Sequence, residues 1–129
     1  MNILIVEDDP NRIEWFKNSF HDDILFITKD TKKAIEWLKE ESFELIFLDH
    51  DLGDEVYVDS GEGTGHEVAE YIADNKLTSD LIVIHTCNPI GAVNMSRTLS
   101  DYKLMIIPFP RLIQIDIDDI RRICEEKEE

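Results

Sequence analysis

Acidic residues follow directly after two short apolar runs in this chain. Glu7 and Asp8 come after the first run, and Asp49 and Asp51 come at the end of the other. Grouped carboxylates repel one another, and burial adds to the cost of keeping them ionised. A divalent cation that prefers oxygen ligands, Mg²⁺ or Mn²⁺, removes that repulsion. If the two runs are neighbouring strands, these residues predict a metal site at the strand ends.

Acids after strands have a second common use, because a carboxylate can cap the helix that follows. Asp9 directly precedes Pro10, and proline is favoured in the first turn of a helix. We therefore expect Asp9 to cap a helix rather than to bind metal. For Asp8 and Asp49 together we favour the metal site.

The elements that must position these acids are short β-branched runs that alternate with stretches of helical period. Several runs are apolar at nearly every position, as expected of parallel strands that are covered on both faces. The predicted strands are Ile3–Val6, Ile24–Thr28, Leu45–Leu48, Leu81–His85 and Leu104–Ile107. The predicted helices cover Pro10–Phe20, a segment from Thr31, His66–Asn75, a segment after Pro89, and Ile117–Glu126.

Five βα units in series predict a single α/β domain over residues 1–129, with a doubly wound five-stranded parallel sheet. The flavodoxin-like strand order 2-1-3-4-5 is the natural solution, and it places a ligand outside the carboxyl ends of the strands. One connection, His50–Gly65, is unusually long, polar and acidic. For its GEGTG segment, residues 61–65, we prefer a flexible lid over the site to a simple solvated loop.

At its first and third strands the sequence resembles the receiver domains of response regulators. The stretch ILIVEDDPNRI is similar to that family's first strand and acidic pair, and ELIFLD is similar to its third strand with the phosphoacceptor aspartate. The resemblance implies that Asp49 accepts a phosphoryl group and that Glu7 and Asp8 bind the metal ion. It further implies that Asp51 offers its backbone carbonyl to the metal and that Thr86 contacts the phosphoryl group.

One residue expected of that family is missing. Receivers end the fifth strand with a lysine followed by Pro-Phe, whereas this chain has Ile107 before Pro108 and Phe109. The loss of the lysine removes a charge-assisted contact to an aspartyl phosphate, which puts ordinary phosphorelay signalling in doubt. Arg111 is close in sequence and is a candidate replacement, although a second proline, Pro110, lies between it and Ile107.

Two further motifs carry groups that suit phosphate chemistry. LDHDLG places His50 between two acids, and HTCNPIGAVNM begins with His85 at the end of an apolar run. These motifs resemble a divergent branch, the cyclic-phosphate-processing receiver domains, which carry LDHDL-like and H-[ST]-x-N-like motifs. The resemblance implies binding or hydrolysis of cyclic phosphates.

In such a reaction, Asp49, His50 and His85 are the predicted catalytic residues, because a histidine can pass a proton to the leaving oxygen. The predicted phosphate-binding groups are Thr86, Asn88, the amides near Gly91 and Asn94. Two alternatives stay open. His50 could instead orient Asp49 or Asp51, and His85 could be a hydrogen-bonded core residue.

The charge balance limits the partners. The 29 acidic and 13 basic residues give a net charge of −16, which disfavours direct binding to duplex nucleic acid. A small anionic ligand then needs a local cation, for which a metal ion is the obvious candidate. No apolar run approaches the roughly 20 residues that cross a bilayer, and the N-terminus lacks a basic signal region. We therefore expect a cytoplasmic protein that makes no membrane contact.

These observations favour a divalent-metal-dependent domain that binds or hydrolyses cyclic or other small phosphate esters. The main alternative is a receiver that is phosphorylated on Asp49 in signal transduction. A third reading is an interaction module that keeps the metal site without the chemistry. Signalling by a phosphorylated receiver or by an interaction module would require a separate protein partner.

Overall fold

The computed structural model describes residues 1–52 and 59–126. Five strands form one parallel sheet in the order β2-β1-β3-β4-β5, which confirms the predicted fold. The strands are β1 (Asn2–Val6), β2 (Ile24–Thr28), β3 (Leu45–Leu48), β4 (Leu81–Ile84) and β5 (Leu104–Ile106). The sheet places β1, β3 and β4 side by side, so the acids that directly follow β1 and β3 lie together at the carboxyl ends of the strands.

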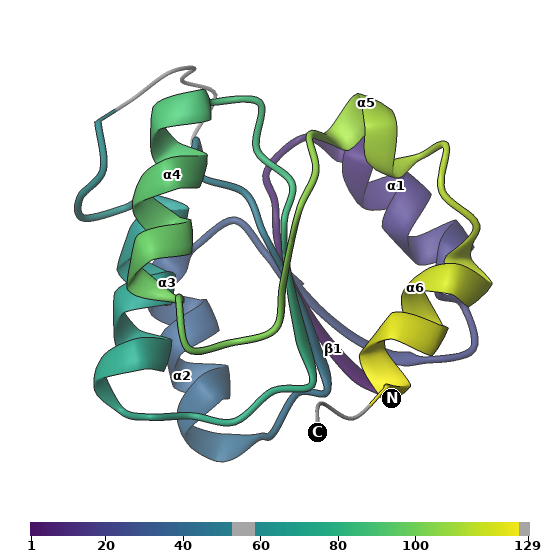
Figure 1. Cartoon of the computed structure of the whole chain (residues 1–129), viewed down its shortest axis with the longest axis horizontal. Helices are drawn as coiled ribbons and strands as arrows, with labels where there is room; N and C mark the ends of the chain where they lie inside the picture. The colour runs from purple at the N-terminus through teal and green to yellow at the C-terminus, as the bar shows by residue number, and fades with distance from the viewer. Residues whose placement is uncertain (53–58, 127–129) are drawn as a thin grey trace.

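Helices cover both faces of the sheet (Figure 1). One layer consists of α1 (Pro10–Ser19), α5 (Phe109–Leu112) and α6 (Ile117–Glu125), and the other of α2 (Thr31–Glu40), α3 (Gly65–Asp74) and α4 (Pro89–Thr98). Because strand side chains alternate between faces, the central strands supply two cores. Odd-numbered residues such as Ile5 and Phe47 pack under the first layer, and even-numbered residues such as Val6 and Leu48 pack under the second.

The helix boundaries follow the predicted start signals closely. Asp9 caps α1, because its side chain accepts from the backbone N–H groups of Asn11 and Arg12. This confirms its interpretation as a cap. The predicted fourth strand extended to His85 and the fifth to Ile107, whereas the observed strands end one residue earlier in both cases.

A short helix, α5, was not predicted. It begins directly after Pro108 and holds Pro110 in its first turn, where a missing N–H costs no internal hydrogen bond. The proline pair therefore starts a helix here rather than an irregular turn. The long connection His50–Gly65 lies partly outside the described residues, but its GEGTG segment is described: the Thr64 hydroxyl donates to the Gly61 carbonyl, and Gly65 begins α3. A lid function for this segment stays a prediction.

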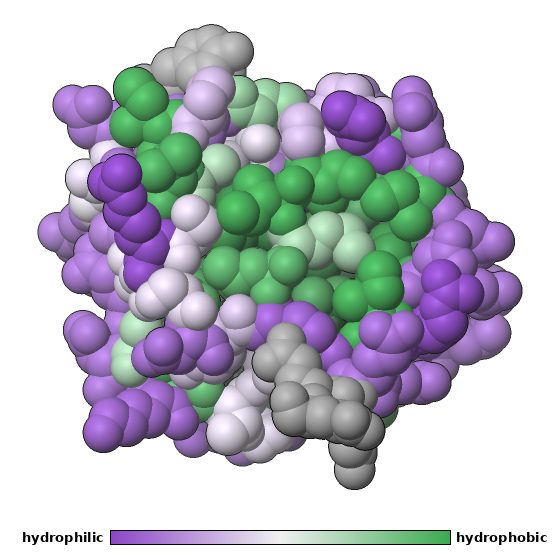
Figure 2. Space-filling model, in the orientation of Figure 1, coloured by the Kyte–Doolittle hydropathy of each residue, from purple (hydrophilic) through white to green (hydrophobic). Residues whose placement is uncertain are grey.

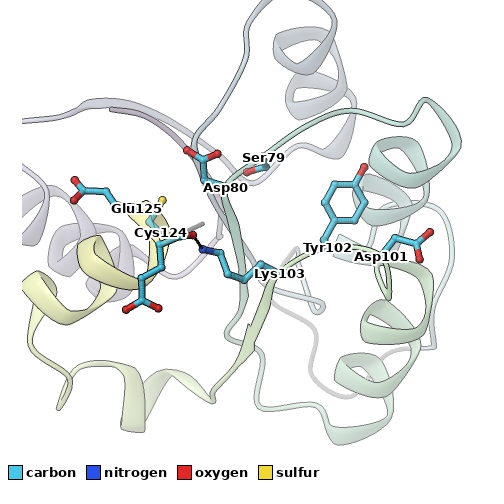
Figure 3. A pocket seen from close by; sticks show the side chains of 8 residues that line it. Ser79, Asp80, Asp101, Tyr102, Lys103, Cys124 and Glu125 are labelled. Carbon is cyan, nitrogen blue, oxygen red and sulfur yellow. Dashed lines mark hydrogen bonds between the residues drawn. The ribbon is translucent and has the colours of Figure 1, made fainter. Parts of the chain in front are cut away.

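The amino end of the sheet carries a hollow of about 360 Å³ (Figure 3). Among the described residues that line it, Lys103 is the one basic residue, and its Nζ donates to the backbone carbonyls of Ile123 and Glu126 at the end of α6. A cation at this point satisfies carbonyls that lack helical partners. We therefore interpret Lys103 as a helix cap.

The face shown in Figure 2 has an apolar area over the edge strand β5 and the strip between α4 and α5. The exposed large hydrophobic residues of α4 and β5 are Ile90, Val93 and Ile106. Contiguous exposed apolar surface is a common feature of contact sites. None of the helices within residues 1–52 and 59–126 is long and apolar enough for a membrane crossing.

Candidate metal and phosphate site

Three buried side chains converge at the carboxyl ends of β1, β3 and β4. Glu7, Asp49 and His85 each offer one ligand atom, and these atoms all lie within 4.8 Å of one another. Each residue directly follows its strand and continues the odd-numbered positions that face α1. The alternation of strand side chains therefore brings all three to one face of the sheet. We call these three residues the acidic cluster.

Glu7 is held tightly in its ionised form. One carboxylate oxygen, Oε1, accepts from His85 Nε2 at 2.9 Å, and Oε2 accepts from the backbone N–H groups of Asp8 at 3.0 Å and Asp9 at 3.1 Å. Burial opposes ionisation of Glu7, but the hydrogen bond and charge of His85, with the bond from Asp9, lower its pKa to about 2.

Asp49 has the opposite character. Burial is the largest cause that raises its pKa to about 7, and the neighbouring charge of Glu7 adds to the effect, while His85 and Arg12 oppose it. The two carboxyls therefore titrate as a pair, and the second proton leaves near neutral pH. A divalent cation would relieve this repulsion, and two carboxylates suit Mg²⁺ or Mn²⁺. The donor set thus fits the predicted metal.

His85 is only half satisfied as a core histidine. Its Nδ1 is the one buried side-chain nitrogen or oxygen, within the described part of the chain, that lacks a hydrogen-bond partner. The imidazole ring lies against Phe16, Phe47 and Phe109, with ring centroids 5.4, 6.4 and 6.3 Å away. A buried polar atom without a partner is costly and calls for a functional explanation.

Arg12 faces the acidic cluster and was missed from the sequence. Its Nη1 lies 3.7 Å from Glu7 Oε1 and 3.8 Å from Asp49 Oδ2. Burial lowers the pKa of the Arg12 guanidinium, but the charges of Glu7 and Asp49 outweigh this effect and raise it. One sequence feature could have identified Arg12: it lies in the first turn of the helix capped by Asp9. A side chain at that position can point back toward the strand ends.

Neither the position of the missing lysine, Ile107, nor its candidate replacement, Arg111, supplies a cation to the acidic cluster. Ile107 packs into the apolar cluster under α1. Arg111 is exposed on α5 and makes no ion pair with any residue that the structure describes. Asp8, a predicted ligand, is not among the three converging residues of the described chain, so its role in metal binding stays a prediction.

His50 lies apart from the acidic cluster, in a network of its own. Its Nδ1 is 2.7 Å from Asp51 Oδ1, and its Nε2 is 2.8 Å from Ser60 Oγ. Asn88 Nδ2 donates to the same Asp51 oxygen at 3.0 Å, and Asn94 Nδ2 donates to Ser60 Oγ at 2.8 Å. One arrangement of protons satisfies these bonds: His50 Nδ1–H donates to Asp51, and the Ser60 hydroxyl donates to Nε2.

This network supports the reading of His50 as the partner of Asp51. The imidazole is fully buried and both of its nitrogens are used by the protein. The backbone N–H of His50 also donates to Asp49 Oδ1 at 2.9 Å, which ties the network to the acidic cluster. Ser60 was not predicted as a site residue, because nothing in its sequence position marks it.

Two glycines make room for the Asp49–His50 segment. A Cβ on Gly65 would lie 1.7 Å from the backbone oxygen of Asp49, and a Cβ on Gly91 would lie 2.4 Å from the His50 ring. The starts of α3 and α4 can therefore approach this segment only with glycine at both positions. Gly91, whose amide was predicted to bind phosphate, lies directly against the His50 ring in the structure.

The remaining predicted phosphate-binding groups already have partners in the fold. Asn88 Oδ1 accepts from the Gly91 N–H at 3.0 Å and caps α4, and Thr86 Oγ1 accepts from the Asn88 N–H at 3.1 Å. The Gly91 amide is thus occupied by the cap. Phosphate binding by Thr86, Asn88, Gly91 and Asn94 remains a prediction.

A five-stranded parallel sheet of this order, with paired acids at the ends of β1 and β3, defines a receiver-type domain. Residues 3–101 match the family described as the Cyclic-phosphate processing Receiver domain. The chain belongs to this family. It matches no characterised protein by sequence alone.

Solved receiver structures have the same fold. A CheY-like response regulator receiver domain from Methanospirillum hungatei JF-1 is 19% identical, with a TM-score of 0.65 over 96% of this chain and 93% of the other. The response regulator TrrA from Thermotoga maritima, solved with Mg²⁺ and BeF, is 19% identical, with a TM-score of 0.63 over 95% and 97%. The BeF3-activated receiver domain of Klebsiella pneumoniae RstA is 19% identical, with a TM-score of 0.65 over 98% and 100%.

Proposed function

We propose that this domain binds or hydrolyses cyclic or other small phosphate esters in a divalent-metal-dependent reaction. The observation that carries the proposal is the acidic cluster. Two buried carboxylates lie beside a histidine whose Nδ1 has no hydrogen-bond partner in the described structure. They lie at the carboxyl ends of the strands, where such folds bind ligands. Burial, with repulsion from Glu7, keeps Asp49 protonated up to near neutral pH, which is a stability cost that a metal site explains.

Glu7 and Asp49 would hold the metal ion, with Asp8 and the backbone carbonyl of Asp51 as further ligands expected from the receiver pattern. The ion, either Mg²⁺ or Mn²⁺, supplies polarisation of the phosphoryl oxygens and lowers the pKa of a bound water. Relatives give independent support for magnesium, since the Thermotoga maritima protein was solved with it.

The protein's own groups then divide the remaining work. His85 carries the proton for the leaving oxygen, because it belongs to the acidic cluster and its Nδ1 has no hydrogen-bond partner among the described residues. Thr86, Asn88, Gly91 and Asn94 line the neighbouring end of β4 and the start of α4, from where they orient the ester. His50 reaches a ligand only through the hydroxyl of Ser60, since both ring nitrogens are engaged.

The test is turnover by the purified chain with Mg²⁺ or Mn²⁺. The substrates are 2′,3′-cyclic and 3′,5′-cyclic nucleotides and oligonucleotides that end in a cyclic phosphate. We expect His85→Gln to lose about a hundredfold or more of the rate, as general acid–base groups do, and Asp49→Asn to lose at least as much because it removes a metal ligand. His21→Gln, which changes an exposed histidine, is the matched control. The proposal fails if the wild-type protein shows neither turnover nor metal-dependent binding with any of these substrates.

A second candidate function is a regulatory receiver that is phosphorylated on Asp49 and signals to a protein partner. It is favoured by the position of Asp49 at the end of β3, beside Arg12 and Glu7. The apolar area over β5 would be the contact surface for such a partner (Figure 2).

The fluorescence of Trp15 can separate the two functions, because its ring packs against Phe109 and Phe16, which border His85. In a Trp37→Phe background, beryllofluoride with Mg²⁺ should change this signal if Asp49 is a phosphoacceptor. An unchanged signal with intact metal binding would argue against the regulatory function.

A further inference from the structure

Arg12 is the one cation paired with the acidic cluster among the residues that the structure describes. The two ion-pair distances, 3.7 and 3.8 Å, exceed the 2.7–2.9 Å typical of charge-assisted hydrogen bonds. The one side-chain hydrogen bond of Arg12 in the described chain is a weak contact of Nη2 with Cys87 Sγ at 3.7 Å. The guanidinium therefore balances charge here while most of its donor capacity is unused.

The position of Arg12 is nevertheless well defined. Its backbone N–H bonds to the capping carboxylate of Asp9, which fixes the first turn of α1. Its guanidinium carbon lies 4.9 Å from the ring centroid of Phe109, so the planar group stacks on an aromatic face. A quarter of the side chain is exposed, which leaves it open to a ligand that enters the site.

An anion needs such a group, because the chain as a whole carries a net charge of −16. The end of β5 offers no cation, since Ile107 is part of the apolar core under α1. Arg12 reaches the site from α1 instead, where its guanidinium lies near Glu7 at the end of β1 and over the ring of Phe109 at the start of α5. A guanidinium can donate two parallel N–H bonds to two phosphoryl oxygens, which an ammonium group cannot do.

We propose that Arg12 is the phosphoryl-binding residue of this site, and that its guanidinium donates to the oxygens of a phosphate held beside the metal ion. This inference rests on the proposed function, since it names a residue that recognises the proposed ligand class. It assigns Arg12 a role in binding the anion and none in binding the metal.

The same charge has opposite effects on the two ligands. The guanidinium repels a divalent cation and competes for Glu7 and Asp49, so it weakens binding of metal alone. It attracts an anion and donates hydrogen bonds to it, so it strengthens phosphate binding. Removal of this side chain should therefore shift the two affinities in opposite directions, whereas misfolding would weaken both.

The experiment compares the wild-type protein with Arg12→Met, which keeps apolar contact with Phe109, and with Arg12→Lys. Mn²⁺ affinity is measured alone, and inorganic phosphate affinity is then measured at saturating Mn²⁺, both by calorimetry. For Arg12→Met we expect tighter Mn²⁺ binding by a few fold and weaker phosphate binding by about tenfold to a hundredfold, the range for a lost charged hydrogen bond. Arg12→Lys should fall between the two, and Arg111→Ala should match the wild type in both measurements.

The outcomes separate the inference from the proposed function. If the wild type binds phosphate and Arg12→Met binds it equally well, the inference is overturned and the proposed function stands. If both affinities fall together in Arg12→Met, the residue is structural and the inference is again overturned. A wild-type protein that binds Mn²⁺ but no phosphate overturns the inference, and the proposed function is then decided separately by turnover and binding of the cyclic substrates.

Discussion

Replacement of Asp49 by asparagine should stabilise the metal-free protein, and increasingly so as the pH rises. Burial and the charge of Glu7 raise the pKa of Asp49 from 3.8 to about 7. Between these values the folded protein keeps a proton that the unfolded chain has released, so the free energy of unfolding falls with rising pH. Each pKa unit corresponds to about 1.4 kcal/mol, which gives a total loss of about 4 kcal/mol for the wild type.

Glu7 contributes in a different pH window. Its pKa is lowered from 4.5 to about 2, chiefly by the hydrogen bond and charge of His85 acting against burial. The stabilisation from Glu7 is therefore fully present above pH 4.5 and is lost as the pH falls toward 2. Measurements above about pH 5 consequently isolate the effect of Asp49 within this pair.

The assay is urea unfolding with a chelator present, at several values from about pH 5 to about pH 8. The difference in unfolding free energy between Asp49→Asn and the wild type should grow by about 3 kcal/mol across this range. Asp74→Asn, which changes an exposed carboxylate on α3, should show a constant difference. Mg²⁺ should stabilise the wild type and leave Asp49→Asn nearly unchanged. A difference for Asp49→Asn that does not vary with pH would refute this account of the acidic cluster.

Three further changes test other parts of the fold. Gly91→Ala should cost about 1–3 kcal/mol because its Cβ meets the His50 ring at 2.4 Å, as overpacking does. In a His50→Ala background the same change should be neutral or stabilising by up to about 1 kcal/mol, and an equal penalty in urea unfolding would disprove the clash. Ser60→Ala should lower turnover without a change in Mn²⁺ affinity if His50 acts through the serine hydroxyl; unchanged turnover would leave His50 a purely structural role. Lys103→Met should speed amide hydrogen exchange at the end of α6, and unaltered exchange would contradict the capping role.

The sheet and the acidic cluster were predictable for the same reason. Runs such as Ile3–Val6 and Leu45–Leu48 are apolar at every position, which only a strand covered on both faces requires. Once those runs are neighbours, residues directly after them must lie together. The alternation of side chains also explains why the two histidines lie apart. His85 continues the odd-numbered positions and joins Glu7 and Asp49, whereas His50 continues the even-numbered positions on the other face.

The contacts that these side chains make with other parts of the chain could not be predicted from the sequence pattern. Arg12 reaches the acidic cluster only because Asp9 and Phe109, nearly a hundred residues apart, fix its backbone and its guanidinium. Ser60 meets His50 through a loop whose path no periodicity specifies. Arg111 is closer in sequence to the position of the missing lysine, but it lies exposed on the short helix that begins at the two prolines. Sequence pattern thus predicted the strands and not the contacts between loops.

The charges of the site imply that a metal ion and a phosphate should bind cooperatively. With Asp49 protonated, the remaining pair of Glu7 and Arg12 is neutral and attracts neither ligand strongly. Release of that proton leaves one excess negative charge, which favours a cation and opposes an anion. Addition of a divalent ion places two further positive charges beside Arg12, which favours an anion. Phosphate affinity should therefore be measurable only with metal present, and phosphate must strengthen metal binding by the same factor, because linked binding free energies are reciprocal.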